Sequence, residues 1–304
     1  MIPVMLNIKF FNMRLRYLII LFVLISIFSG CGSRSGQSSA VNDKPVILVS
    51  ILPQVTFVEK IAGDDFTISL LIPHGANPTT YSLLPAQMAE IARAETWFRM
   101  GYVGFELSWA DKILQTNPSM KVVDLSEGLD LISAGTNPET GARTGADPHT
   151  WLSPSLVKKM ARVIRDELIA LRPDRSEAYQ LGYQQFLREI DETDTEIRKI
   201  LSEYHGRKFI SFHPSLSYFA REYGLEQFSL QQRGKEPTPG HIAGLVKLAR
   251  EENIRVIFIQ SDFDRENARM FAQEINGEAI QVWPLNPEWS ENLLTITRLL
   301  RDNF

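Results

Sequence analysis

The sequence predicts an α/β protein of two lobes, each with a parallel sheet flanked by helices, bridged by one long rigid helix, with a ligand cleft between the lobes. Short apolar runs alternate with longer amphipathic segments in both halves of the chain, as parallel strands joined by crossover helices require. A charged stretch with helical periodicity separates the two alternations. The 304 residues, 44% of them hydrophobic, are enough to bury two cores.

The first half contains four predicted strands with helices between them. Residues 46–52 are almost continuously apolar, which is typical of a strand covered on both faces. Further strands are predicted at 66–72, 96–100 and 120–125, and helices at 53–63, 85–94 and 105–114. Residues 131–146 are rich in Gly, Thr, Asn and Pro and indicate an exposed loop. A helix capped by Ser153 or Ser155 completes a first lobe at 46–172.

One long helix is predicted to connect the halves. Residues 173–205 keep helical spacing of apolar side chains through a highly charged run, and would extend roughly 45 Å, longer than one small domain needs. The alternative is a coiled-coil arm, although the apolar stripe is not a sustained heptad repeat. A second lobe at 206–304 follows. Its strands are predicted at 208–212, 255–260 and 279–283, and its helices at 215–223, 239–252, 266–275 and 289–300.

The N-terminus predicts export. Basic residues precede a short apolar run at 17–28, and small residues follow it, as a signal peptidase requires. Cys31, the only cysteine, stands where a lipoprotein signal places its acylated residue, so we predict a signal peptide at 1–30 and a lipid anchor at Cys31. An ordinary signal peptide with an incidental cysteine is the alternative, and Met13 could be the true start. The small polar residues 31–45 predict a flexible tether beside a bacterial membrane, on its periplasmic or cell-surface side.

The charge of the chain argues against one class of partner. The formal net charge is -4 and no dense run of Lys and Arg occurs, so no nucleic-acid partner is expected. Residues 1–30 contain three basic residues and no acidic ones, so cleavage would leave a mildly acidic protein of formal charge -7.

Two histidines stand where α/β proteins bind ligands. His149 lies between Pro148 and Pro154, which fix the backbone and hold the imidazole on a stiff loop. His213 follows the first strand of the second lobe, and ligands bind beyond the carboxyl ends of parallel strands. If the lobes face one another, these histidines converge in the cleft. In the alternative interpretation, His149 packs near a helix start and His213 merely begins its helix.

The remaining histidines are weaker candidates. His74 follows the second strand on a loop, whereas His205 and His241 lie on charged helical surfaces and are expected to be solvated. Imidazole nitrogen suits Zn²⁺, Mn²⁺ and related ions. A closed zinc site has about four protein ligands, so Glu, Asp, Gln or water must supply what two histidines do not.

Several motifs together point to a known family. They are residues 77–81 (NPTTY) with Pro85, 104–106 (GFE), 147–154 (DPHTWLSP), 213–215 (HPS) with 218–220 (YFA), 236–239 (EPTP) and 256–259 (VIFI). From residue 46 to the C-terminus the chain resembles the zinc and manganese class of substrate-binding lipoproteins of bacterial ABC importers. The resemblance implies two α/β lobes bridged by a rigid helix, with the metal in the cleft.

The resemblance also implies four metal ligands, of which this chain retains two. The family's second and third ligands match His149 and His213. Its first ligand, a histidine, falls at Thr79, and its fourth, an aspartate before a Pro-Leu pair, falls at Trp283.

Three completions of the site follow from these replacements. In the first, His74 replaces the missing histidine while Gln260 or Glu106 supplies an oxygen. In the second, water completes a weaker site. In the third, the cleft holds something other than a bare ion, with Trp283 as a flat apolar wall.

The predicted function is therefore to bind and deliver a metal ion without catalysing a reaction. We expect a monomeric, lipid-anchored binding protein, not an enzyme. Its expected ion is zinc, with manganese as the second choice, and it is expected to deliver the ion to an ABC permease in the inner membrane. One alternative is an adhesion or scaffolding protein on the same fold that has lost metal binding. A metal-dependent hydrolase is a further alternative, although no HExxH motif and no obvious general base accompany the histidines.

Overall fold

A computed structural model of the chain describes residues 44–134, 145–231, 236–260 and 265–304. Lys44–Phe304 forms one compact unit. The predicted signal peptide, Cys31 and nearly all of the predicted tether lie outside the described residues. Within the described ranges, no helix combines the length and the apolarity needed to cross a membrane.

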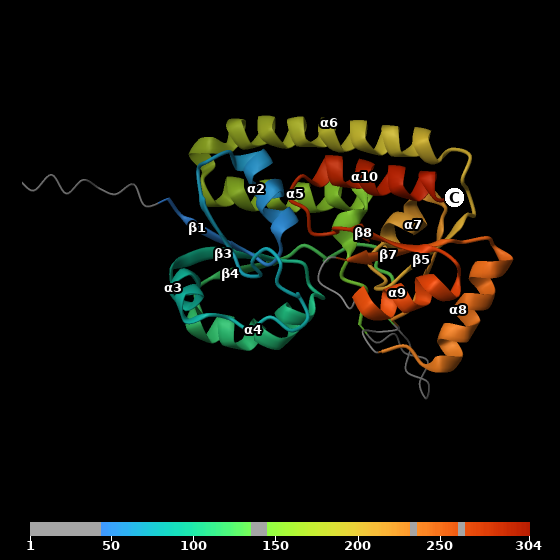
Figure 1. Ribbon diagram of the computed structural model, residues 1–304. Helices are drawn as coiled ribbons and strands as arrows, with labels where there is room; N and C mark the ends of the chain where they lie inside the picture. The colour runs from blue at the N-terminus through green and yellow to red at the C-terminus, as the bar shows by residue number, and fades with distance from the viewer. Residues whose placement is uncertain (1–43, 135–144, 232–235, 261–264) are drawn as a thin grey trace, which may run out of the picture. The chain divides into compact units, whose positions relative to one another are not determined.

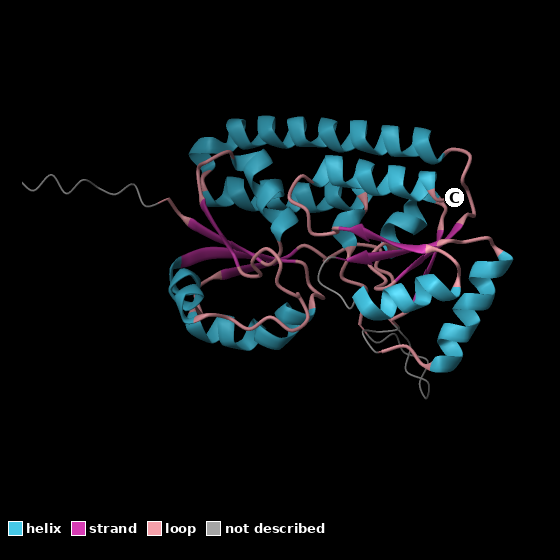
Figure 2. Ribbon diagram, viewed as in Figure 1, coloured by secondary structure: helices cyan, strands magenta, loops and turns pink. Residues whose placement is uncertain are grey.

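The first lobe contains a four-stranded parallel sheet (Figure 1). Its strands are β1 (Val46–Val49), β2 (Thr67–Leu70), β3 (Ala94–Arg99) and β4 (Lys121–Asp124), in the order β2-β1-β3-β4. Helices lie on both faces of this sheet (Figure 2), which explains why every residue of β1 is buried. The predicted fold class, two α/β lobes with parallel sheets, is confirmed.

The second lobe repeats the same strand order. Its strands are β5 (Lys208–Ser211), β6 (Glu226–Ser229), β7 (Val256–Gln260) and β8 (Glu278–Val282), in the order β6-β5-β7-β8. The sequence did not predict β6. This strand, Glu-Gln-Phe-Ser, lies at the edge of the sheet and carries one apolar side chain, so no apolar run marks it.

Strand β1 ends earlier than the predicted 46–52. The side chain of Gln54 causes this, because its Oε1 accepts hydrogen bonds from the backbone nitrogens of Ser50 (2.8 Å) and Ile51 (3.0 Å). These bonds satisfy N–H groups that would otherwise continue a strand, and helix α2 (Leu52–Ala62) starts at once.

The other helices follow the predicted pattern closely. They are α3 (Pro85–Arg93), α4 (Gly104–Thr116), α5 (Pro154–Leu171), α6 (Ser176–Leu201), α7 (Ser217–Tyr223), α8 (Pro239–Glu251), α9 (Arg265–Glu274) and α10 (Trp289–Asp302). The long helix begins at Ser176 because residues Pro173–Arg175 form a separate 3₁₀ turn. Its 26 residues extend about 39 Å.

Helix α6 packs along α5, which precedes it, and along α2 and α10, which come from the first and last parts of the described chain (Figure 1). One continuous apolar core includes the first sheet, these helices and one face of the second sheet, and a second apolar cluster covers the other face of the second sheet. The buried stripe of α6 consists of Tyr179, Tyr183, Phe186, Ile190, Ile197 and Leu201. The long helix therefore belongs to the core and is not a free arm.

Gly182 allows α6 to approach α2 closely. A Cβ atom at this position would lie 2.4 Å from the carbonyl oxygen of Ile61 and 2.9 Å from that of Lys60. We expect Gly182→Ala to lower the free energy of unfolding by about 2 kcal/mol, because two helix backbones would have to separate. Urea denaturation followed by circular dichroism measures this.

Gly244 in α8 supplies the matched control. A Cβ atom there meets nothing within 4 Å, so Gly244→Ala should raise the free energy of unfolding by about 0.5–1 kcal/mol through helix propensity alone. If both alanine variants were more stable than the wild type, the close packing of α2 on α6 would be refuted.

Candidate functional site

A cavity of about 800 Å³ opens at the carboxyl ends of the second sheet and is lined by both lobes. The first lobe contributes Thr79, Tyr102 and Val103. The second contributes His213, which follows β5, and Gln260, the last residue of the neighbouring strand β7. This position between β5 and β7 is where parallel sheets of this type bind ligands.

The loop that carries His149 completes the cavity wall and brings the two histidines together. The ring centroids of His149 and His213 lie 5.2 Å apart, with the ring planes at 73°. Both rings line the cavity. The structure thus brings these two side chains together in the cleft, as expected from the sequence.

Each imidazole is held through its Nδ1 atom. The Oδ1 atom of Asp147 lies 2.7 Å from Nδ1 of His149 and also accepts a hydrogen bond from the backbone nitrogen of His149 at 2.9 Å. The Oε1 atom of Gln231 lies 3.1 Å from Nδ1 of His213. Because both partners are acceptors, the proton of each neutral ring belongs on Nδ1, and the lone pair belongs on Nε2. This is the orientation that metal-binding histidines have in proteins.

The electrostatics favour neutral His213 and charged Asp147. Burial, followed by the nearby His149, lowers the pKa of His213 to about 4, so this ring is uncharged at neutral pH. Burial pushes the pKa of Asp147 upward, but the charge and hydrogen bonds of His149 outweigh it and hold the pKa below its usual range. A neutral imidazole beside a second ring that is paired with a carboxylate is suited to bind a cation.

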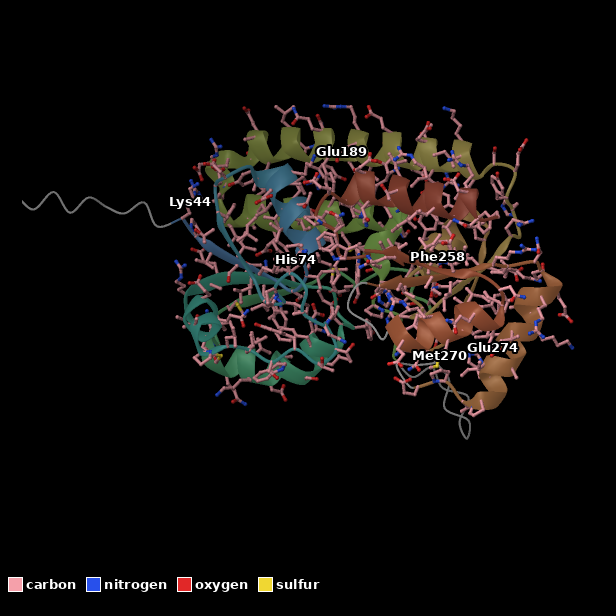
Figure 3. The ribbon with its side chains drawn as sticks, viewed as in Figure 1. Lys44, His74, Glu189, Phe258, Met270 and Glu274 are labelled. Atoms are coloured by element: carbon pink, nitrogen blue, oxygen red, sulfur yellow. The ribbon has the colours of Figure 1, made fainter. Side chains whose placement is uncertain are left out.

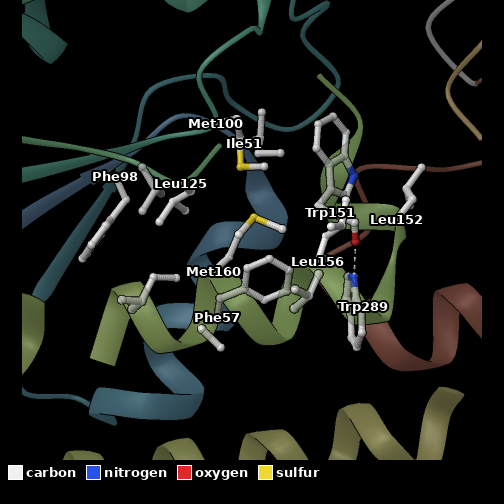
Figure 4. Packing of buried hydrophobic residues seen from close by; sticks show 14 of the residues in the cluster. Ile51, Phe57, Phe98, Met100, Leu125, Trp151, Leu152, Leu156, Met160 and Trp289 are labelled. Carbon is white, nitrogen blue, oxygen red and sulfur yellow. Dashed lines mark hydrogen bonds between the residues drawn. The ribbon is translucent and has the colours of Figure 1, made fainter. Parts of the chain in front are cut away.

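Groups of the second lobe hold the His149 loop in place. The hydroxyl of Tyr218 in α7 donates to the carbonyl oxygen of Asp147 (2.8 Å) and accepts from the backbone nitrogen of Ile132 (3.0 Å). Trp151 donates from Nε1 to the carbonyl oxygen of Pro284 (2.9 Å), and Trp289 donates from Nε1 to the carbonyl oxygen of Trp151 (2.6 Å; Figure 4). The loop is therefore fixed on both sides of His149.

Glu222 of α7 makes a further link at the start of α5. Its carboxylate accepts hydrogen bonds from the backbone nitrogen of Ser155 at 3.1 Å and from the hydroxyl of Ser153. A carboxylate at a helix N-terminus is favourable because the helix dipole is positive there.

The structure brings only two of the other candidates to the cavity of the two histidines. Thr79 and Gln260 line the cavity. His74, labelled in Figure 3, lies on the surface, with its ring 4.5 Å from that of Trp283, and these two side chains line a separate, much smaller pocket. His74 is thus not placed to replace the histidine missing at Thr79, and Trp283 does not form a wall of the cleft cavity.

Glu106 has a structural role in this arrangement. Its carboxylate is fully buried and accepts hydrogen bonds from the backbone nitrogens of Met100 and Gly101, both at 2.7 Å. It is not among the residues that line the cavity. Burial raises the pKa of this carboxyl to about 7, against the opposing effect of its hydrogen bonds.

Sequence reasoning missed the residues that orient the rings. Asp147 stands two residues before His149, a spacing at which a carboxylate bonds the following backbone, and this signal could have identified it. Gln231 follows the unpredicted edge strand β6, so the sequence offered no reason to place it beside His213. Among residues 44–134, 145–231, 236–260 and 265–304, no group of three or more His, Cys, Asp or Glu side chains is arranged to hold a metal ion.

Comparison with known proteins decides the family. The family described as "Zinc-uptake complex component A periplasmic" (ZnuA) matches residues 47–304, which is most of the chain. The chain belongs to the ZnuA family. The sequence-based resemblance to zinc and manganese substrate-binding proteins of ABC importers is confirmed.

Individual ZnuA-like relatives support this assignment. A crystal structure of a zinc-bound ZnuA deletion mutant is 36% identical, with a TM-score of 0.80, and the match covers 86% of this chain and 98% of that one. The high-affinity zinc uptake system protein ZnuA of Bacillus subtilis is 26% identical over 85% of both chains. A putative metal-binding protein of Chlamydia muridarum is 26% identical over 92% of this chain and 99% of its own length.

Membership of the ZnuA family also settles the class of activity. Its members are periplasmic metal-binding components of uptake systems and are not enzymes, so the hydrolase alternative is wrong. An extracytoplasmic location of this chain agrees with the predicted export.

Proposed function

We propose that this protein captures zinc, and less favourably manganese, in the cleft between its lobes and delivers the ion to an ABC permease. The observation that carries the proposal is the pair of imidazoles, His149 and His213, 5.2 Å apart and each held through Nδ1. Relatives named for zinc binding and for manganese binding support the choice of ions. A lipid at Cys31 would keep a monomeric protein beside the membrane that holds the permease.

Nitrogen ligands support zinc over manganese. Manganese is bound preferentially by carboxylates, carbonyl groups and water, whereas zinc accepts imidazole readily and binds more tightly to a given site. The described lining offers two imidazoles, and the carboxylate nearest to them, that of Asp147, is engaged by His149.

Competition for zinc against a chromophoric chelator tests this proposal. The purified wild-type protein should bind one zinc ion, and the double variant His149→Ala/His213→Ala should bind it at least ~100-fold more weakly, because a two-nitrogen site is abolished. Manganese titrated in parallel should bind more weakly than zinc.

His205→Ala is the matched control, since it removes an exposed imidazole that is not among the cavity-lining residues. It should leave zinc binding as in the wild type. Equal zinc affinity of the double variant and the wild type would refute the site, and a wild-type protein that binds neither metal would favour an adhesion or scaffolding role.

A further inference from the structure

Gln260 presents a buried hydrogen-bond donor that has no partner among the described residues. It is the last residue of β7, it lines the cavity, and its Nε2 atom is inaccessible and makes no hydrogen bond there. A buried polar group without a partner costs about 1–3 kcal/mol, so such groups are rare unless something satisfies them. An amide N–H₂ group donates, and the partner it lacks is an acceptor, not a cation.

The two histidines leave a zinc ion incompletely coordinated. Zinc in proteins takes four ligands in a tetrahedron, and His149 and His213 supply two nitrogens. The described part of the chain places no third His, Cys, Asp or Glu with them in an arrangement suited to a metal. The described residues thus leave two coordination positions for a molecule that enters the cavity with the ion.

The cavity has the size and the walls of a site for an organic ligand. Its volume of about 800 Å³ falls within the range of small-molecule pockets, roughly 300–1,000 Å³, and greatly exceeds that of one ion. Val103, Ile132 and Leu285 provide apolar wall, and Thr79 and Tyr102 add hydroxyl groups.

The charge of the lining limits the nature of that ligand. Asp147 and Glu236 are the charged side chains in the described lining, and it contains no Lys or Arg. A complex with net positive charge is favoured there over an anionic one.

We propose that the cleft binds zinc together with one small α-amino acid. This inference rests on the zinc site of the proposed function. The amino acid chelates the ion through its amine nitrogen, which loses a proton to solvent, and through one carboxylate oxygen. These two atoms complete the tetrahedron that His149 and His213 begin. The second carboxylate oxygen accepts the hydrogen bond of Gln260 Nε2. The complex of Zn²⁺ with one amino-acid anion carries a charge of about +1, which suits the two carboxylates of the described lining.

Equilibrium dialysis with radiolabelled glycine, with and without zinc, tests this inference on the purified protein. Glycine should be retained only when zinc is present, at about one glycine per zinc. In Gln260→Leu the ratio of bound glycine to bound zinc should fall about tenfold, because one buried hydrogen bond is lost. Gln260→Glu, which keeps the shape but replaces the donor by an acceptor, should lower the ratio as well. Gln281→Leu, at an exposed residue of β8, should not change it.

Each other outcome overturns the inference. If the protein binds zinc but no glycine, the inference is overturned and the zinc site stands. The same holds if glycine removes zinc from the protein without being retained itself. Glycine retained equally by Gln260→Leu, Gln260→Glu and the wild type would remove Gln260 from the site. Failure to bind zinc with or without glycine would overturn the proposed function as well.

Discussion

Replacing Glu106 by leucine is expected to lower the free energy of unfolding by about 4 kcal/mol at neutral pH, because two buried backbone N–H groups lose their acceptor. These groups belong to Met100 and Gly101, which connect β3 to α4, and both bonds measure 2.7 Å. Glu106→Gln keeps one acceptor oxygen and should lose about half as much. Urea denaturation of the metal-free protein measures both.

The effect of Glu106 should also depend on pH in a defined direction. Burial raises its pKa to about 7 in the folded protein, from 4.5 in the unfolded chain, so the folded state binds more protons between these values. The carboxyl therefore stabilises the fold most below pH 4.5, and this contribution is lost as the pH rises to about 7. The stability difference between the wild type and Glu106→Gln should narrow over that interval by about 2–3 kcal/mol.

Glu95→Leu is the control for these measurements, since Glu95 is exposed on β3 of the same lobe. Its effect should stay within about 0.5 kcal/mol at every pH. A Glu106→Leu variant as stable as Glu95→Leu would show that the buried carboxylate does not secure this turn.

Replacing Trp289 by alanine is expected to cost about 4 kcal/mol of stability, because a buried aromatic ring at the centre of the core is removed. Its ring lies edge-on to Phe57 at 5.8 Å and to Phe186 at 6.2 Å. Its Nε1 atom donates to the carbonyl oxygen of Trp151, two residues after His149 (Figure 4). The same urea denaturation experiment measures the loss.

Two variants separate packing from hydrogen bonding at Trp289. Trp289→Phe keeps most of the ring contacts and should lose only about 1–2 kcal/mol, through the unsatisfied carbonyl. Trp109→Ala removes a half-buried tryptophan that lies beside Phe105, and should cost less than Trp289→Ala. Equal losses in the two alanine variants would refute a central role of Trp289.

The fold was largely predictable because most strands of this protein are buried. Strands β1 and β7 have nearly every residue buried, so they appear in the sequence as apolar runs between amphipathic helices. The edge strand β6 has no fully buried residue and only one apolar residue, so its pairing with β5 depends on tertiary contacts that a local pattern does not contain.

The site was predictable in its histidines and less so in its surroundings. The sequence alone identified both histidines as candidates, His149 by the adjacent Pro148 and His213 by its position after the strand β5. The direction of a side chain on an irregular loop is set by packing, which is why His74 contacts Trp283 and lines a different pocket from the other two histidines. The burial of the Gln260 amide and the orientation of Gln231 likewise depend on contacts between strands.

The hydrogen bonds of the His149 loop have a mechanical consequence. The loop belongs to the first lobe in sequence, yet Tyr218, Pro284 and Trp289, all beyond the long helix, hold its backbone and the Trp151 side chain. The bonds of Tyr218 and Pro284 couple His149 to the lobe of His213, so we expect a displacement of the lobes to leave the 5.2 Å spacing of the two histidine rings unaltered. The two imidazoles form one side of the cleft, and the loop of Thr79 together with Tyr102 forms the opposite side. Binding and release of the ion would then depend on movement of the side formed by Thr79 and Tyr102. The pair of histidine nitrogens would stay in place as a preformed half of the binding site.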